Sequence, residues 1–297
     1  MDTNILLENG TNELEILEFT VGGYSYGINV AKIREIIPYQ PVIPVPNAHP
    51  SIEGIFMPRD TMITAIDLKN CMGRGESDPE GMFIITNFNK LNIAFHVENV
   101  LGIYRVSWKD IIKPSATIST ADDSIATGIV KKGDKLIIIL DFEKIVSDIN
   151  PETGLKISEI SALGERTRNN IPILVAEDSV LLNKLIVESL KAAGYTNLIH
   201  VENGQKAYDI ICQCKEEGSL KEHVQLVITD IEMPEMDGHR LTRLIKEDPA
   251  TADIPVIIFS SLVNDEMRRK GEALGADAQL SKPEIGNLVR VIDDLVG

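Results

Sequence analysis

Cysteine, tryptophan and long apolar runs are all scarce in this chain of 297 residues. It contains one tryptophan and three cysteines, which are Cys71, Cys212 and Cys214. Three thiols without a second cysteine pair provide neither a disulfide framework nor a four-ligand zinc site, so we expect free structural thiols. No apolar run approaches the length of a membrane span, and the first residues lack the pattern of a signal peptide. These absences predict a cytoplasmic protein with no direct membrane insertion.

Positive charge is also in short supply. The formal net charge is −16, and it divides into −7 over residues 1–150 and −9 over residues 171–297. An acidic surface repels the phosphate backbone of nucleic acids, so we expect no nucleic-acid partner, and a transcription-factor function is disfavoured. The length and a hydrophobic content of 43% suit two domains with cores of their own.

The most informative stretch is residues 226–238, LVITDIEMPEMDG. Its short apolar run ends abruptly at Asp230, and turn-forming residues follow at once. Such a run is typical of a fully buried strand in a parallel sheet, and the residue after it lies at the sheet edge where open α/β folds bind ligands. An isolated aspartate at this position is more often a helix cap or a turn former than a functional residue. A functional interpretation therefore requires partners elsewhere in the chain.

Three other apolar runs end in polar side chains suited to one chemistry. The run 173–176 precedes Glu177 and Asp178, the run 256–259 precedes Ser260 and Ser261, and the run 278–281 precedes Lys282. Clustered carboxylates repel one another and need a cation, for which Mg²⁺ is the natural choice. An aspartate beside such an ion can accept a phosphoryl group, while an amine and a hydroxyl hold the phosphoryl oxygens.

Together these features resemble the receiver domain of two-component signalling over residues 171–297, which implies a doubly wound, flavodoxin-like α/β fold. The resemblance implies that Asp230 is the phosphoacceptor and that Ser260 and Lys282 bind the phosphoryl group. It implies that Asp178, Asp230 and the backbone carbonyl of Glu232 bind Mg²⁺ and that Glu177 assists them through water. One position departs from the family pattern. An aromatic residue that rotates on activation is usual three positions before the lysine, but Gln279 stands there, which leaves the exit route of the signal open.

The first half of the chain shows a different pattern, with many short β-type runs separated by turn residues. This spacing predicts a small-barrel or sandwich architecture, with one short helix expected over 30–37. Asp67 and Asp141 each precede a helical stretch and are expected to act as helix caps. No phosphate loop, nucleophile motif or metal-ligand cluster is present in this half.

Residues 19–37, 43–68 and 125–142 resemble CheW-type coupling domains. That family implies two small five-stranded barrels without catalytic activity, which bridge the cytoplasmic tips of chemoreceptors to the CheA histidine kinase. By this resemblance Ile33, Glu35 and Arg59 are the residues expected to contact a receptor, although a solvated turn is an equal explanation for Arg59. The glycine common after that arginine is replaced by Asp60.

The whole chain is therefore expected to be a multidomain protein, with an all-β CheW-like double barrel followed by a receiver. The predicted divisions are a flexible segment at 1–13, a coupling domain at 14–149, a linker at 150–170 with a short helix near 158–166, and the receiver. This combination resembles the CheV-type chemotaxis coupling proteins. The resemblance implies a non-enzymatic adaptor at receptor arrays that CheA phosphorylates, serving adaptation or draining phosphate. A response regulator with a catalytic N-terminal output is the alternative, disfavoured by the missing catalytic motifs.

Overall fold

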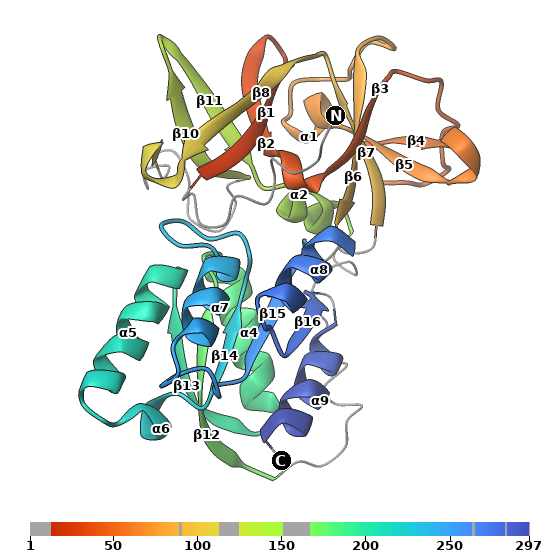
Figure 1. Ribbon diagram of the computed structural model, residues 1–297. Helices are drawn as coiled ribbons and strands as arrows, with labels where there is room; N and C mark the ends of the chain where they lie inside the picture. Colours follow the sequence, from red (N-terminus) through yellow and green to blue (C-terminus); the bar gives the residue numbers. More distant parts are fainter. Residues whose placement is uncertain are drawn as a thin grey trace. The chain divides into compact units, whose positions relative to one another are not determined.

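The computed structural model describes residues 13–88, 91–112, 125–150, 167–262, 265–282 and 284–296. These residues fall into two compact units, an N-terminal unit up to residue 150 and a C-terminal unit from residue 167. The segment predicted to be flexible lies almost entirely outside the described residues, as does the helix predicted near 158–166. Each unit has its own sheets (Figure 1) and its own hydrophobic core.

The N-terminal unit is built almost entirely from short strands. Its elements are β1 (Glu13–Val21), β2 (Tyr24–Asn29), β3 (Ile33–Pro38), β4 (Ile52–Phe56), β5 (Ile63–Asp67), α1 (Leu68–Cys71), β6 (Met82–Phe88), β7 (Leu91–Val97), β8 (Asn99–Ser107), β9 (Ile111–Ile112), β10 (Ala126–Lys132), β11 (Lys135–Leu140) and α2 (Phe142–Ile149). The strands form a six-stranded sheet in the order β8-β1-β2-β11-β10-β9 and a five-stranded sheet in the order β3-β6-β7-β5-β4. The two-residue strand β9 gives the first sheet one strand more than the expected five.

One hydrophobic core joins these two sheets. Phe19 from the first sheet and Phe95 from the second both pack edge-on against Phe142 of α2, with ring centroids 6.2 and 4.6 Å away. Helix α2 is held in place by Asp141, whose carboxylate accepts a hydrogen bond from the backbone N–H of Lys144. Asp67 caps α1 in the same way, so both predicted helix caps are confirmed.

The helix predicted over residues 30–37 is wrong beyond its first turn. Only Val30–Lys32 is helical, as a 3₁₀ turn, and Ile33–Pro38 forms β3 against β6. The register shifts between Ile33 and Glu35, so Ile33 and Ile36 both face the shared core although they are three residues apart. A bulge in a strand thus reproduces the spacing of a helix, and pairing with β6 decides the outcome.

The C-terminal unit alternates strands and helices. Its elements are β12 (Asn169–Ala176), α4 (Val180–Ala192), β13 (Tyr195–Val201), α5 (Gly204–Glu216), α6 (Leu220–His223), β14 (Leu226–Thr229), α7 (Gly238–Glu247), β15 (Val256–Ser260), α8 (Asp265–Ala273), β16 (Ala278–Ser281) and α9 (Ile285–Val296). The five strands are parallel, in the order β13-β12-β14-β15-β16. Only the one-turn helix α6 was not predicted.

Helices cover both faces of this parallel sheet. The core on one face takes residues from α4 and α9, and the core on the other takes residues from α5 and α7. All four residues of β14 are buried, as expected for a strand covered on both sides. The predicted fold class, an all-β domain followed by a doubly wound α/β domain, is confirmed. The strand order places the ends of β12, β14, β15 and β16 along one edge of the sheet.

Candidate functional site

Three carboxylates meet at the carboxyl edge of the parallel sheet. Glu177 and Asp178 follow β12, and Asp230 follows β14 on the neighbouring strand. One oxygen from each of these side chains lies within 4.8 Å of the others. The strand-end acids that the sequence singled out are therefore brought together by the pairing of β12 with β14.

A lysine from the far side of the sheet completes the cluster. The Lys282 Nζ lies 2.8 Å from Oδ2 of Asp230 and 3.0 Å from Oε2 of Glu177, and all three side chains are almost fully buried. The backbone N–H of Lys282 donates to the carbonyl of Ser260, which ties the ends of β16 and β15 together. One ammonium group is thus shared by two carboxylates in a water-poor environment, where the interactions between charges are strong.

Glu177 is the most perturbed of these groups. Burial raises the pKa of its carboxyl well above the ordinary value, the Lys282 ammonium opposes this rise, and the negative charges of Asp230 and Asp178 add to it. Its position is fixed by a backbone bond from its N–H to the carbonyl of Val201 and by a bond from the N–H of Ser179 to its Oε1. The carboxylate is held in this place although burial and the charges of Asp230 and Asp178 oppose its ionisation.

The Asp230 loop depends on contacts that sequence reasoning did not single out. The N–H of Ile231 donates to Oδ1 of Asp230 at 2.6 Å, which orients the carboxylate. Gly238, the first residue of α7, donates its N–H to the carbonyl of Ile231. A Cβ on Gly238 would overlap the backbone oxygen of Asp230, so only glycine fits this close approach. The Asp-Gly pair in the sequence indicated a turn but not this contact.

The donor set fits a hard divalent cation. Three carboxylates against one ammonium leave a surplus of negative charge, and oxygen donors are the ligands that Mg²⁺ prefers. Burial is the main cause of the raised pKa of Glu177, and the neighbouring carboxylates of Asp230 and Asp178 add to it. Glu177, Asp178 and Asp230 are the residues that could hold the ion. Glu232 lies two residues past Asp230 in the same loop, and the role of its carbonyl stays a prediction.

Ser260 and Gln279 lie on the two strands beyond β14. Ser260 ends β15, is completely buried, and accepts a hydrogen bond from the N–H of Leu262 through its Oγ. Gln279 donates from its Nε2 to the carbonyl of Arg268 in α8, at 2.6 Å. Its amide rests against Gly271, where a Cβ would overlap the amide atoms. Gln279 therefore occupies the position at which the receiver family usually has a mobile aromatic side chain, and its amide is hydrogen-bonded to α8.

In the N-terminal unit the structure separates the three residues expected to contact a partner. Arg59 is 82% exposed and lies 3.3 Å from the carboxylate of Glu35, so these two share one surface. Ile33 packs in part against the core instead. Arg59 and Asp60 both have positive φ, at 51° and 64°, a conformation that glycine adopts more easily than they do. Where the family commonly has glycine, Asp60 therefore adopts the left-handed backbone conformation itself.

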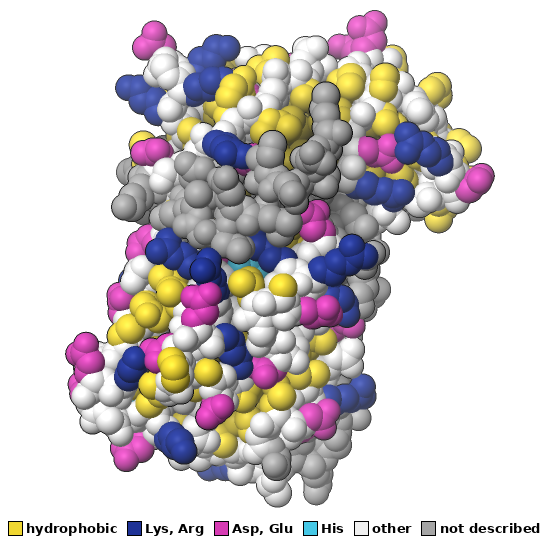
Figure 2. All heavy atoms as spheres, in the orientation of Figure 1, with side chains coloured by type: hydrophobic (Ala, Val, Ile, Leu, Met, Phe, Trp, Pro, Cys, Tyr) yellow, Lys and Arg dark blue, Asp and Glu magenta, His cyan; other side chains and the backbone are white. Residues whose placement is uncertain are grey.

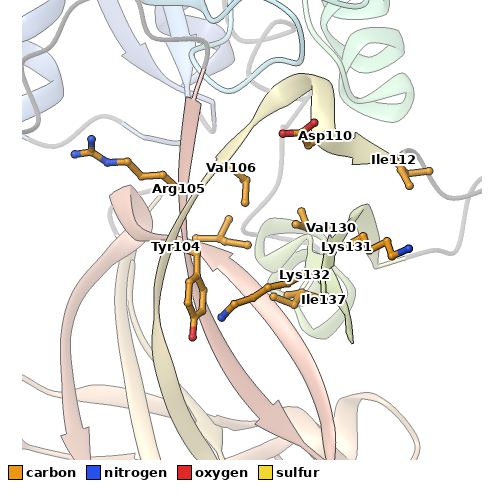
Figure 3. Close-up of a pocket in the computed structure, with 10 residues that line it drawn as sticks. Tyr104, Arg105, Val106, Asp110, Ile112, Val130, Lys131, Lys132 and Ile137 are labelled. Atoms are coloured by element: carbon orange, nitrogen blue, oxygen red, sulfur yellow. The ribbon is translucent and has the colours of Figure 1, made fainter. Parts of the chain in front are cut away.

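The first sheet of the N-terminal unit also contains a hollow of about 620 Å³, shown in Figure 3. Ile137 and Val130 contribute apolar surface, and Tyr104 and Lys132 point toward one another, with the Lys132 Nζ 2.8 Å from the ring centroid. Lys132 also approaches Glu18. This hollow therefore offers apolar surface and an engaged cation, a lining suited to contact with a partner more than to chemistry.

Comparisons with known proteins agree with this division. A CheW-like domain matches residues 15–150, and a response regulator receiver domain matches residues 173–293. Chemotaxis protein CheV3 of Helicobacter pylori is 30% identical over 91% of this chain and 91% of its own length, and CheV2 of the same organism is 28% identical over 88% and 86%. The scaffolding protein TtCheW from Thermoanaerobacter tengcongensis, a crystal structure, is 26% identical over 43% of this chain and 88% of its own, with a TM-score of 0.40.

Among the described helices, none combines the length and the apolar character needed to cross a membrane. Both domains occur in the order seen in the CheV proteins, and the match runs through nearly the whole chain. The alternative with a catalytic N-terminal output is not favoured, because the CheW-like domain belongs to coupling proteins. The chain belongs to the CheV family of chemotaxis proteins, as a coupling adaptor that carries a phosphorylatable receiver domain.

Proposed function

We propose that Asp230 accepts the phosphoryl group and that Lys282 holds it there. The observation that carries this proposal is the Lys282 ammonium, 2.8 Å from Asp230 and 3.0 Å from Glu177. An ammonium in this place stabilises the negative charge that develops on transferred phosphoryl oxygens. Ser260, at the end of the adjacent strand, is proposed to bind the same oxygens.

Mg²⁺ is the proposed cofactor. Glu177, Asp178, Asp230 and the carbonyl of Glu232 would hold it, and the clustering of the three carboxylates supports this set. When bound, the ion supplies the positive charge that three acids and one lysine lack. Asp230 attacks the phosphorus of the donor phosphohistidine through one carboxylate oxygen, and the phosphorus–nitrogen bond breaks so that the histidine leaves as a neutral imidazole after taking up a proton. Lys282 stays paired with the acyl phosphate that forms on Asp230.

The proposed phosphodonor is the CheA histidine kinase, and the proposed partners are CheA and the cytoplasmic tips of chemoreceptors at receptor arrays. In the N-terminal unit, Glu35 and Arg59 support a receptor contact, because the guanidinium is exposed and held beside a carboxylate. Ile33 is the third proposed contact, through the part of its side chain outside the core. Phosphorylation adds charge to a site that is already negative, which biases the receiver between conformations and so adjusts coupling during adaptation. Draining phosphate from CheA is the second role proposed for the same reaction.

The test is phosphotransfer from labelled CheA to the full chain in the presence of Mg²⁺. We expect Asp230→Asn to lose the label, because an amide cannot act as the nucleophile. Asp209→Asn is the matched control, since Asp209 is an exposed aspartate of α5 whose carboxylate binds only Gln205 among the described residues. Equal labelling of Asp230→Asn and the wild type would remove Asp230 from the reaction.

A second experiment addresses the partners. Full-length protein is captured on receptor tips and, separately, on CheA. We expect Arg59→Glu to weaken receptor capture while CheA capture persists, because the change places two acids side by side at the proposed contact. Arg74→Glu is the control, as another charge reversal in the same unit, where Arg74 stacks on Tyr24. Equal losses from both variants would argue for general electrostatics and against a specific contact.

A further inference from the structure

A small hollow lies between α7 and α8 of the C-terminal unit, outside the carboxylate cluster. It encloses about 250 Å³, and its lining includes Arg240, Arg243 and Lys270. A volume of this size holds roughly eight waters at liquid density and lies below the range of about 300 Å³ at which pockets for drug-sized ligands begin. Figure 2 shows Lys and Arg side chains, with histidine atoms between them, over this end of α7 and α8. The hollow suits a small, negatively charged group.

Two of the three cations in the lining are available. Among the described residues no carboxylate pairs with Arg240 or Lys270, whereas Arg243 binds Glu247 of its own helix at 2.7 Å. The acids of the lining are both engaged, because Glu247 holds Arg243 and the Asp237 carboxylate caps α7 through the N–H of Arg240. Two positive charges without a carboxylate partner among the described residues therefore line the same hollow, within a domain whose net charge is negative.

His239 provides an independent sign of a missing ligand. Its side chain lines the hollow and is only 4% exposed, yet its Nε2 is buried without a hydrogen-bond partner in the described part of the chain. Burial and the nearby positive charge of Lys270 lower the pKa of His239 to about 3, so the ring is neutral near pH 7. A buried polar atom left unsatisfied in a native fold requires an explanation, and an absent ligand is one.

We propose that this hollow is a binding site for a tetrahedral oxyanion, namely a phosphate group carried by a small molecule or free in solution. Arg240 and Lys270 would bind its oxygens directly, since guanidinium and ammonium groups are the usual donors to phosphate. The guanidinium of Arg243, which also binds Glu247, and the imidazole of His239 lie in the same lining. The site is distinct from Asp230, but the two are linked through the backbone, because α7 begins at Gly238, which donates to the Ile231 carbonyl in the loop after Asp230.

The experiment uses the full chain with a chelator present, so that binding at the carboxylate cluster does not contribute. Inorganic phosphate is titrated at constant ionic strength in chloride, while the imidazole C–H resonances of His239 are followed by NMR and assigned with His239→Gln. Glycerol phosphate forms a second arm that separates free phosphate from a small ester. We expect a saturable shift of the His239 resonances with either phosphate, and none with chloride alone.

Variants decide whether the binding is specific. Lys270→Gln and Arg240→Gln should each weaken phosphate binding about tenfold, as expected for the loss of one charge-assisted contact. Arg269→Gln is the matched control, because Arg269 is an exposed neighbour on α8 that does not line the hollow. It should change the affinity by less than about twofold, the scale of an exposed charge. The proposal would be overturned if the His239 resonances did not move at the highest phosphate concentration. It would also be overturned if Arg269→Gln and Lys270→Gln weakened phosphate binding equally. Neither outcome bears on phosphotransfer to Asp230.

Discussion

Replacing Lys282 with methionine is the most direct probe of the buried charges at the proposed phosphoacceptor site. Methionine keeps most of the side-chain volume but removes the ammonium that lies 2.8 Å from Asp230 and 3.0 Å from Glu177. Breaking a buried pair by removing one partner costs about 3–5 kcal/mol, because the remaining charge stays buried without compensation. With a urea dependence of about 2 kcal/mol per molar, the unfolding midpoint of the C-terminal unit should fall by roughly 2 M.

The assay is urea unfolding without Mg²⁺, followed by circular dichroism for the whole chain and by tryptophan fluorescence for the N-terminal unit. The chain has a single tryptophan, Trp108, which packs against the core of that unit. The urea midpoint reported by Trp108 should therefore be the same in the variant as in the wild type. The midpoint of the C-terminal unit, seen by circular dichroism, should fall. An unchanged second transition, or a shift of the Trp108 signal instead, would refute the picture of a shared buried ammonium.

The stability loss caused by Lys282→Met should also depend on pH, because Glu177 titrates beside Lys282. The folded pKa of Glu177 is raised, so the folded state binds this proton more tightly than the unfolded chain does. Stability of the C-terminal unit should accordingly fall as pH rises from about 4.3, the ordinary value of a glutamate, through the raised folded value. Loss of Lys282 removes the charge that opposed the rise, so the penalty in Lys282→Met should shrink as pH falls. A penalty independent of pH would contradict this reasoning.

Three further predictions concern other parts of the chain. Burial lowers the pKa of His96, but hydrogen bonds to the Glu53 carboxylate and to a backbone carbonyl outweigh burial and raise the pKa above the ordinary value. Protonated His96 therefore stabilises the N-terminal unit. This stabilisation is complete below about pH 6.5 and is lost as pH rises through the folded pKa. In Glu53→Gln, the urea midpoint of the N-terminal unit, followed by Trp108 fluorescence, should depend less on pH. Gly238→Ala should destabilise the C-terminal unit by at least about 1–3 kcal/mol in urea unfolding and slow phosphotransfer, because its Cβ overlaps the Asp230 backbone. Gln279→Ala should change the free energy of unfolding by less than about 1 kcal/mol, because loss of the hydrogen bond to Arg268 is offset by removal of the buried, unpaired Oε1. Hydrogen exchange of the backbone amides in α8 should nevertheless become faster, because that bond ties α8 to β16.

Much of the fold was predictable because strand patterns and turn residues carry it. The C-terminal unit was predicted from four apolar runs with polar ends, and β14 illustrates why this works, since a strand buried on both faces leaves a continuous apolar signature. The region from 33 to 38 was not predictable, because a β-bulge gave Ile33 and Ile36 the spacing of a helix. Local periodicity cannot distinguish a helix from a bulged strand when pairing with a distant strand decides the structure.

The site divides in the same way. Which acids gather could be predicted, because parallel strands end at one edge and the residues just after each apolar run are known from the sequence. Contacts between elements could not be predicted, such as the bond from Gln279 to Arg268 or the pairing of Arg59 with Glu35. These depend on how a helix lies on the sheet and on where a turn points, which no local pattern encodes. The hollow between α7 and α8 belongs to this second class.

Gln279 offers one route by which the proposed phosphoacceptor site can act on α8. Two paths lead from the site to this helix. One runs along the chain after Ser260, and the other runs through β16, where Gln279 lies three residues before Lys282 and hydrogen-bonds α8. If Asp230 gains a phosphoryl group as proposed, we expect Lys282 to change its contacts, because it is paired with Asp230. Gln279, on the strand that precedes Lys282, binds α8 by a hydrogen bond to the carbonyl of Arg268. The Gln279→Ala variant separates the two paths. If it abolishes the response of α8 to phosphorylation while phosphotransfer continues, the signal travels along β16; if the response persists, it travels through the segment after Ser260.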